Sequence, residues 1–164
     1  MDASNDTTCT YTLPTGETVL LDVEDAELCC LRWRKHPMGY ATHTTPRPEH
    51  KNVLMHRVIL ERVLQRPLIK GEQCDHANGN KNDNRRCNLR LATHSENQRN
   101  QRRNKANSTG FKGVYFDKRS RKWCAQIKVN RRHIYLGTFD TPEEAHHAYR
   151  EAAVNHHGKF ARFE

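Results

Sequence analysis

The sequence predicts an α+β protein made of two small modules, in each of which antiparallel strands precede a helix. In residues 73–100, a short strand, a polar loop, a second strand and a helix follow one another. In residues 111–158, three strand patterns joined by short turns lead into one helix. A β-rich lead-in comes before both, and we expect domain boundaries at 1–52, 53–104 and 105–164.

Turn formers and a helix cap mark the elements of the first module. Residues 78–84 are rich in Asn, Asp and Gly, which favour turns, and residues 89–91 alternate apolar and polar side chains as a half-buried strand does. Thr93 and Glu96 form a capping box, in which each side chain satisfies a backbone N–H at the helix start. Asn97 therefore lies in the first turn of the predicted helix.

Three short motifs, Asp75-His76, Asn88-Leu89-Arg90 and Glu96-Asn97, resemble the ββα-metal active site of the HNH endonucleases, particularly the phage- and intron-encoded homing enzymes. The stretch from Val23 to Arg57 is similar to the lead-in that such enzymes carry before their catalytic motif. The resemblance implies a ββα-metal nuclease fold and metal-dependent hydrolysis of DNA phosphodiester bonds.

Phosphodiester hydrolysis needs an activated water on one side and charge neutralisation at the leaving oxygen on the other. His76 suits the first task because its unperturbed pKa, about 6.5, lies near physiological pH. Asp75 and the carbonyl oxygen of Asn97 suit the second, because Mg²⁺ prefers oxygen ligands and is often held by only one or two protein groups. A bound ion would act as a Lewis acid and stabilise the departing 3′ oxygen. We expect Mg²⁺, with Mn²⁺ as the alternative.

Two further residues complete the candidate site. By the same resemblance, Asn88 ties the loop together through hydrogen bonds to backbone groups and fixes the orientation of the His76 ring. His56 opens the segment 58–64, whose apolar spacing predicts a helix. For His56, a role at the substrate phosphate and a purely structural role both remain open. We expect His94 to be exposed.

The cysteine spacing does not match a zinc site. Cys74 and Cys87 stand singly, and Cys29 and Cys30 are adjacent, so no ligand set with a recognised spacing exists. No apolar run approaches the length needed to cross a bilayer, and the first residues do not follow a leader pattern. We therefore expect a cytoplasmic protein with six free thiols.

After a predicted linker from Arg99 to Asn107, the second module begins near Ser108. Its strands are predicted at 111–115, 122–129 and 132–137. A helix follows, with Thr141 and Glu144 as its capping box and Gly158 placed to end it. Small residues recur along it at helical spacing, which lets the helix lie close against a sheet: Ala145, Ala148, Ala152 and Ala153, together with Tyr149.

The segments 112–114, 123–127, 135–139 and 143–145 resemble the APETALA2-type, or ethylene-response-factor, DNA-binding domain. In that family the sheet, rather than the helix, enters the major groove. Strand alternation agrees independently, because the helix can cover only one face of the sheet. By position in the family motif, the DNA contacts would be Lys112, Tyr115, Gln126, Lys128, His133 and Tyr135, with Arg119, Arg121 and Arg132 nearby. The plant domains favour other residues at Tyr115, Asp117 and Tyr135, so their target sequence does not transfer.

The charge distribution also predicts a nucleic-acid partner. The chain has 28 Lys and Arg against 19 Asp and Glu, a formal net charge of +9. The positive excess lies after Lys81, whereas the first thirty residues are acidic. Such an uneven distribution suits binding to phosphates by counterion release, so the expected partner is double-stranded DNA.

A single active site predicts an enzyme that nicks one strand per binding event. No heptad seam indicates a dimer, so we expect a monomer, with a dimer as the alternative. The alternative is a DNA-binding regulator with a catalytically silent HNH fold, against which the presence of Asp75, His76 and Asn97 argues. Binding of structured RNA is less well supported, because the predicted sheet lacks the aromatic pattern of an RNA-recognition motif.

Overall fold

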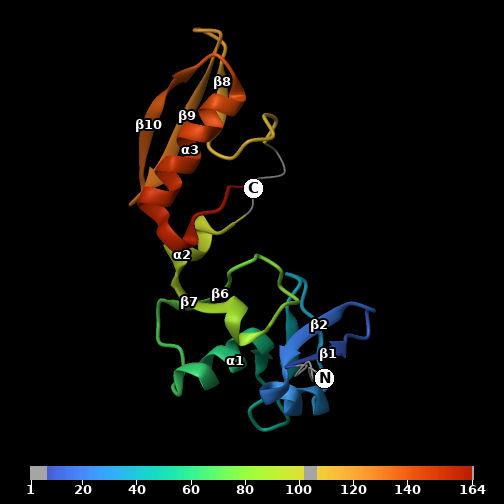
Figure 1. Ribbon diagram of the computed structural model, residues 1–164. Helices are drawn as coiled ribbons and strands as arrows, with labels where there is room; N and C mark the ends of the chain where they lie inside the picture. Colours follow the sequence, from blue (N-terminus) through green and yellow to red (C-terminus); the bar gives the residue numbers. More distant parts are fainter. Residues whose placement is uncertain (1–6, 102–106, 164) are drawn as a thin grey trace, which may run out of the picture. The chain divides into compact units, whose positions relative to one another are not determined.

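The computed structural model describes residues 7–101 and 107–163 (Figure 1). The chain divides into two compact units, Met1–Asn97 and Gln98–Glu164. It is a mixed α+β protein with a β-rich start and several small antiparallel sheets. Most of the predicted linker, residues 102–106, lies outside the described residues.

The first unit begins with a hairpin and a small three-stranded sheet. Strand β1 (Thr8–Thr12) pairs antiparallel with β2 (Thr18–Asp22), and the 3₁₀ helix η1 (Val23–Cys30) follows. The second sheet has the order β3-β4-β5, with strands Arg34–Lys35, Ala41–Thr44 and Asn52–Leu54. Helix α1 (Met55–Leu64) comes next, as its apolar spacing predicts, and ends at Gln65 in the left-handed region.

A single apolar core joins these elements to the strand that follows the polar loop. Burial of this apolar surface is the main stabilising contribution, because water is excluded from the contacts between the elements. Its buried members come from β2, η1, β4, α1 and β7, together with Leu13 just after β1 and Trp33 just before β3. They are Leu13, Val19, Leu21, Leu28, Trp33, Ala41, Met55, Ile59 and Leu89.

Two strands and a short helix complete the first unit. Strand β6 (Glu72–His76) pairs antiparallel with β7 (Leu89–Thr93), and the 3₁₀ helix η2 (Arg86–Asn88) lies between them. Helix α2 (His94–Arg99) follows directly. The Thr93 amide donates to Glu96 Oε2 at 2.8 Å and the Glu96 amide donates to Thr93 Oγ1 at 3.3 Å, which confirms the predicted capping box.

The polar loop between β6 and β7 is fastened to the first hairpin of the chain. The Leu20 amide of β2 donates to Asn82 O at 2.8 Å, and the Asn84 amide donates back to Leu20 O at 2.9 Å. An ion-pair network adds to this connection, because the fully buried Asp25 of η1 binds Arg62 of α1 and Arg86 of η2. The lead-in and the loop therefore fold as one unit.

The second unit is a three-stranded antiparallel sheet covered on one face by a helix. Its strands β8 (Val114–Asp117), β9 (Lys122–Val129) and β10 (Arg132–Phe139) lie in the order β10-β9-β8. Helix α3 (Pro142–His157) runs along the sheet and is followed by the 3₁₀ turn η3 (Gly158–Phe160) (Figure 1). Ala145, Tyr149 and Ala153 are the buried residues through which α3 packs on the strands.

The first strand of this sheet differs from the prediction. We expected it at 111–115, but it starts at Val114, because Gly113 has a φ of +77° that an extended strand cannot contain. A Cβ atom at Gly113 would lie 2.0 Å from the Tyr149 ring, so the glycine also permits close packing of the helix. The predicted second strand and the capping box at Thr141 and Glu144 are confirmed.

No helix among the described residues combines the length and the apolar character that crossing a bilayer requires.

Candidate functional site

Strand β6 places Asp75 and His76 on opposite faces of the β6–β7 hairpin, because successive residues of a strand alternate. Asp75 is 4% exposed and lies directly across from Arg90 of β7. Arg90 binds Asp75 Oδ2 through Nε at 2.7 Å and through a terminal guanidinium nitrogen at 2.7 Å. Both contacts go to the same oxygen, so Arg90 compensates the charge of the buried carboxylate.

Asn97 of α2 reaches the same face of the hairpin as Asp75. Its Nδ2 donates to Gln73 Oε1 at 2.8 Å, and Gln73 lies two residues before Asp75 on β6. The structure thus gathers a carboxylate and a carboxamide on one face. No group of three or more His, Cys, Asp or Glu residues in the described part of the chain could hold a metal ion.

His76 lies on the opposite face, where β6 packs against α1. Its ring is 5% exposed and meets the His56 ring edge-on, with 5.0 Å between the ring centroids. The Tyr40 ring packs against both imidazoles. Its centroid lies 4.7 Å from that of His56 and 6.0 Å from that of His76. Cys74, on the same face as His76, donates to His56 O at 3.4 Å. The structure therefore brings together the two histidines that the sequence singled out.

Burial keeps both imidazoles neutral at physiological pH. It lowers the pKa of His56 to about 3, and the positive charge that His76, Arg57 and Lys81 can carry acts in the same direction. Burial also lowers the pKa of His76, although its hydrogen bond to Asn84 and the nearby Asp75 oppose this shift. A neutral imidazole can accept a proton, which a general base requires.

Asn88 spans the polar loop from the inside. Its Oδ1 accepts a hydrogen bond from the Asn78 amide at 2.9 Å, and its Nδ2 donates to Asp83 O at 2.7 Å. Asn88 is 6% exposed, so these bonds satisfy a buried carboxamide. Both partners are backbone groups of the loop, which is the arrangement expected of a brace.

Three residues beside the histidines were not among the sequence-predicted site residues: Tyr40, Lys81 and Asn84. Lys81 Nζ lies 4.6 Å from the centroid of the Tyr40 ring and donates to Met38 O at 2.8 Å. Asn84 Oδ1 lies 3.1 Å from His76 Nε2. Tyr40 fell within the lead-in that carried the resemblance, but no sequence signal separated Asn84 from its neighbouring asparagines.

The sheet of the second unit has an open face formed by alternate residues. Gln126 pairs across the strands with Tyr135, and Lys128 pairs with His133. Tyr115 stands next to Cys124 on the same face. Tyr115 is 40% exposed and Tyr135 is 58% exposed, whereas Ala125 and Ile127, which point to the helix, are buried.

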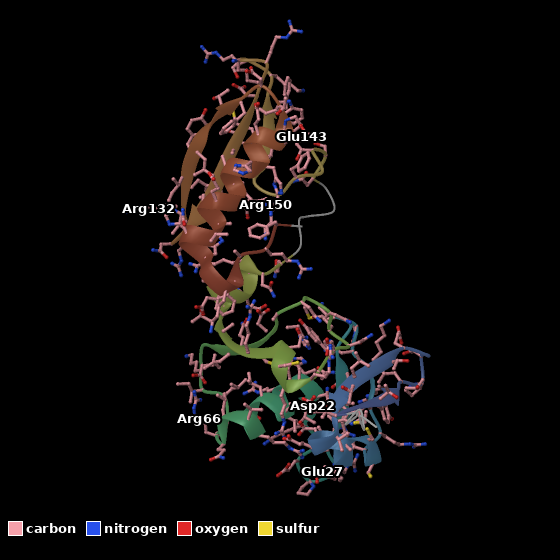
Figure 2. All side chains as sticks on the ribbon, viewed as in Figure 1. Asp22, Glu27, Arg66, Arg132, Glu143 and Arg150 are labelled. Atoms are coloured by element: carbon pink, nitrogen blue, oxygen red, sulfur yellow. The ribbon has the colours of Figure 1, made fainter. Side chains whose placement is uncertain are left out.

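The predicted arginines lie at the ends of this sheet. Arg119 and Arg121 are exposed in the turn between β8 and β9, where Asp117 holds the Arg119 amide at 3.0 Å. Arg132 is exposed at the start of the edge strand β10 (Figure 2). Basic side chains therefore stand at both ends of the open face.

Lys112 does not join this group. Its Nζ donates to Arg99 O at 2.8 Å and to Gln101 O at 2.7 Å. Burial lowers the pKa of Lys112 to about 8, and the positive charge of Arg162 contributes to the shift. The structure thus places this amine on the backbone that leads out of α2.

Comparisons with known proteins agree with this division of the chain. Residues 53–99 match the family model of the HNH endonuclease domain, and residues 109–158 match that of the AP2 domain. The chain thus carries an HNH endonuclease domain followed by an AP2 domain, which confirms both resemblances found in the sequence.

A relative of the chain comes from a phage. Protein 3.8 of Escherichia phage T7 is 33% identical over 97 residues, which cover 59% of this chain and 79% of that protein. The chain belongs to the same family as Protein 3.8. No solved structure matches the chain.

Proposed function

We propose that the protein is a metal-dependent HNH endonuclease that nicks double-stranded DNA, with β6, β7 and α2 as a ββα-metal motif. The observation that supports this most directly is the HNH match at 53–99, which contains all five candidate catalytic and metal-binding residues. Of these, Asp75, His76, Asn88 and His56 are buried in one unit. Asp75, His76 and Asn88 each have a hydrogen-bond partner in the same unit, and such fixed side chains are features that a preorganised site requires.

His76 acts as the general base in this proposal. Its ring is held by Asn84 and by packing against His56 and Tyr40, and its lowered pKa keeps it uncharged at neutral pH. A neutral ring takes a proton from the attacking water and holds it as imidazolium. Asp75, next in sequence, stabilises that positive charge through space.

Asp75 and Asn97 would hold the divalent cation. A buried carboxylate and a carboxamide oxygen form the donor set that Mg²⁺ or Mn²⁺ prefers, and the structure gathers both groups on one face of the hairpin. The bound ion would supply a Lewis acid for the phosphoryl oxygens and the departing 3′ oxygen. Arg90 and Gln73 are the residues that orient these two ligands.

His56 acts by packing rather than as a cation at the phosphate. Its pKa of about 3 leaves the ring neutral, and its Nδ1 has no hydrogen-bond partner among the described residues. Lys81, which is exposed and lies above Tyr40, is the cation of this region that can reach a substrate phosphate. Asn88 fixes the loop that carries Lys81.

The open face of the AP2 domain binds the DNA in this proposal. Gln126, Tyr135 and Tyr115 project from the sheet, where side chains reach base edges in the major groove. Lys128, His133 and the arginines at 119, 121 and 132 contact phosphates, which position the protein on the duplex. The relative in a phage supports action on DNA in an infected cell, as a free-standing or homing nuclease.

Nicking of supercoiled plasmid tests the proposed function. We expect the purified protein to produce open circles with Mg²⁺ or Mn²⁺ and none with a chelator, while His76→Ala is inactive with either ion. Equal activity of the two proteins, or retained activity with the chelator, would contradict the assignment. A protein that binds plasmid but leaves it supercoiled with both ions would instead be the silent DNA-binding regulator.

A further inference from the structure

A buried hydrogen bond joins the candidate general base to a residue that no family match assigns to the site. His76 Nε2 and Asn84 Oδ1 lie 3.1 Å apart, and the two side chains are 5% and 1% exposed. We propose, on the basis of the general-base role proposed above, that Asn84 is the positioning residue that selects the tautomer of His76.

The direction of this hydrogen bond fixes the location of the imidazole proton. A carboxamide oxygen can only accept, so His76 Nε2 must donate and must carry the proton of the neutral ring. The lone pair then lies on Nδ1, which becomes the atom that accepts a proton from water. In the other tautomer, two acceptors would face each other in a buried place, which is unfavourable because neither would have a donor.

Asn84 is held so that its oxygen, and not its nitrogen, faces the ring. Its Nδ2 donates to the thioether sulfur of Met55 at 3.6 Å, which leaves Oδ1 for His76. The backbone amide of Asn84 donates to Leu20 O at 2.9 Å. Rotation of the Asn84 carboxamide would break its hydrogen bond to the His76 ring and turn its Nδ2 away from the Met55 sulfur.

Through this arrangement, the first hairpin (β1 and β2) helps to position His76. Leu20 of β2 bonds to the loop on both sides of Asp83, because its amide also donates to Asn82 O at 2.8 Å. The hairpin thereby fixes the backbone of Asn84, and Asn84 fixes the ring of His76. Asn88 has a different task, because both of its hydrogen bonds go to backbone groups of the loop.

Nitrogen NMR of the ¹⁵N-labelled full chain at pH 8 tests this assignment. Long-range proton–nitrogen correlations distinguish the protonated ring nitrogen from the bare one, and the signals lost in His76→Gln identify the residue. The variants are Asn84→Leu, which keeps the size but removes the acceptor, and Asn84→Asp, which retains an acceptor. Asn80→Leu is the control, because it removes a hydrogen bond to the Asn82 amide in the same loop without contacting His76.

We expect the His76 proton on Nε2 in the wild type, Asn84→Asp and Asn80→Leu, and a shift toward Nδ1 in Asn84→Leu. Nicking by Asn84→Leu should fall about 10- to 100-fold in kcat with KM unchanged, and Asn84→Asp should recover most of the loss. A wild type protonated on Nδ1, which is decisive even if Asn84→Leu does not fold, would overturn the assignment. So would an Asn84→Leu protein that keeps the wild-type tautomer. Absence of nicking by the wild type refutes the nuclease, but it leaves the tautomer measurement unaffected.

Discussion

The two units hold their candidate functional residues in opposite environments. In the HNH unit, Asp75, His76 and His56 are 4–6% exposed and are bound by neighbouring side chains or packed rings. In the AP2 unit, Tyr115 and Tyr135 are 40% and 58% exposed, and Lys128 extends into solvent. The first arrangement fixes groups before the substrate arrives, whereas the second leaves side chains able to adapt to DNA.

This difference suits the two tasks proposed for the units. Proton transfer and charge stabilisation are strongest among preorganised groups from which water is excluded. Phosphate contacts work at the surface, where each adds little energy and salt weakens it. We therefore expect substitutions in the HNH unit to change the cleavage rate and those on the AP2 sheet to change affinity.

The largest effect should come from His76→Ala. Loss of a general base removes about 10²- to 10⁴-fold of rate, and the variant should still bind DNA with wild-type affinity. Plasmid nicking and a binding titration on one duplex measure the two quantities. His147→Ala, an exposed histidine of α3, is the matched control and should cleave normally. A matching loss of DNA affinity in His76→Ala would contradict the assignment of cleavage to the HNH unit and of binding to the AP2 unit.

Acid should destabilise the HNH unit through His56. The pKa of the folded residue, about 3, lies below the unfolded value of about 6.5, so only the unfolded chain gains a proton between these limits. The free energy of unfolding should fall by about 1.4 kcal/mol per pH unit below pH 6.5, up to about 5 kcal/mol in total. Denaturant unfolding from pH 7 to pH 5, compared with His56→Phe, measures this slope. Identical slopes for the two proteins would show that His56 is not buried as a neutral ring.

A buried and an exposed ion pair provide a further contrast. Asp25 is fully buried between Arg62 and Arg86, whereas Asp140 and Lys122 of the AP2 unit pair at 3.0 Å with half or more of each side chain exposed. We expect Asp25→Ala to lower the free energy of unfolding of the HNH unit by about 2–3 kcal/mol. Asp140→Ala should change that of the AP2 unit by less than about 1 kcal/mol. Denaturant unfolding measures both, and similar losses would refute the contrast.

The smallest effect should come from Lys128→Ala on the AP2 sheet. Removal of one phosphate contact should weaken DNA binding a few-fold and lower the slope of log Kd against log salt by about one. Binding titrations between low and physiological salt give this slope. Lys159→Ala, which removes an equal charge from η3, serves as the control. If the slope does not change, Lys128 does not contact a phosphate.

Elements with strong local signals could be located from the sequence. The capping boxes at Thr93 and Thr141 placed the starts of α2 and α3, and turn residues bounded β9. These signals succeed because a cap or a turn is decided by side chains a few residues apart. The predicted start of β8 was wrong because Gly113 adopts a positive φ, and there it packs closely against the ring of Tyr149. Local sequence patterns do not contain a contact with a residue so far along the chain.

The candidate site could be predicted in composition but not in arrangement. No local pattern predicted that Arg90 would bind Asp75 or that Tyr40 would pack on both histidines, because these residues are far apart in the chain. Lys112 stood at a DNA-contact position of the family motif, yet its long side chain reaches backbone carbonyls of its own unit. Such partners depend on tertiary packing, which brings together residues far apart in the chain.

Crystals of the protein with duplex DNA and Mn²⁺ would test the proposed nuclease centre most directly, because anomalous scattering locates the ion without assumption. The proposed centre requires an ion bound to both the Asp75 carboxylate and the Asn97 amide oxygen, at coordination distances of about 2.0–2.2 Å. A Mn²⁺ peak at other residues, or occupied DNA with no ion at this pair, would contradict it.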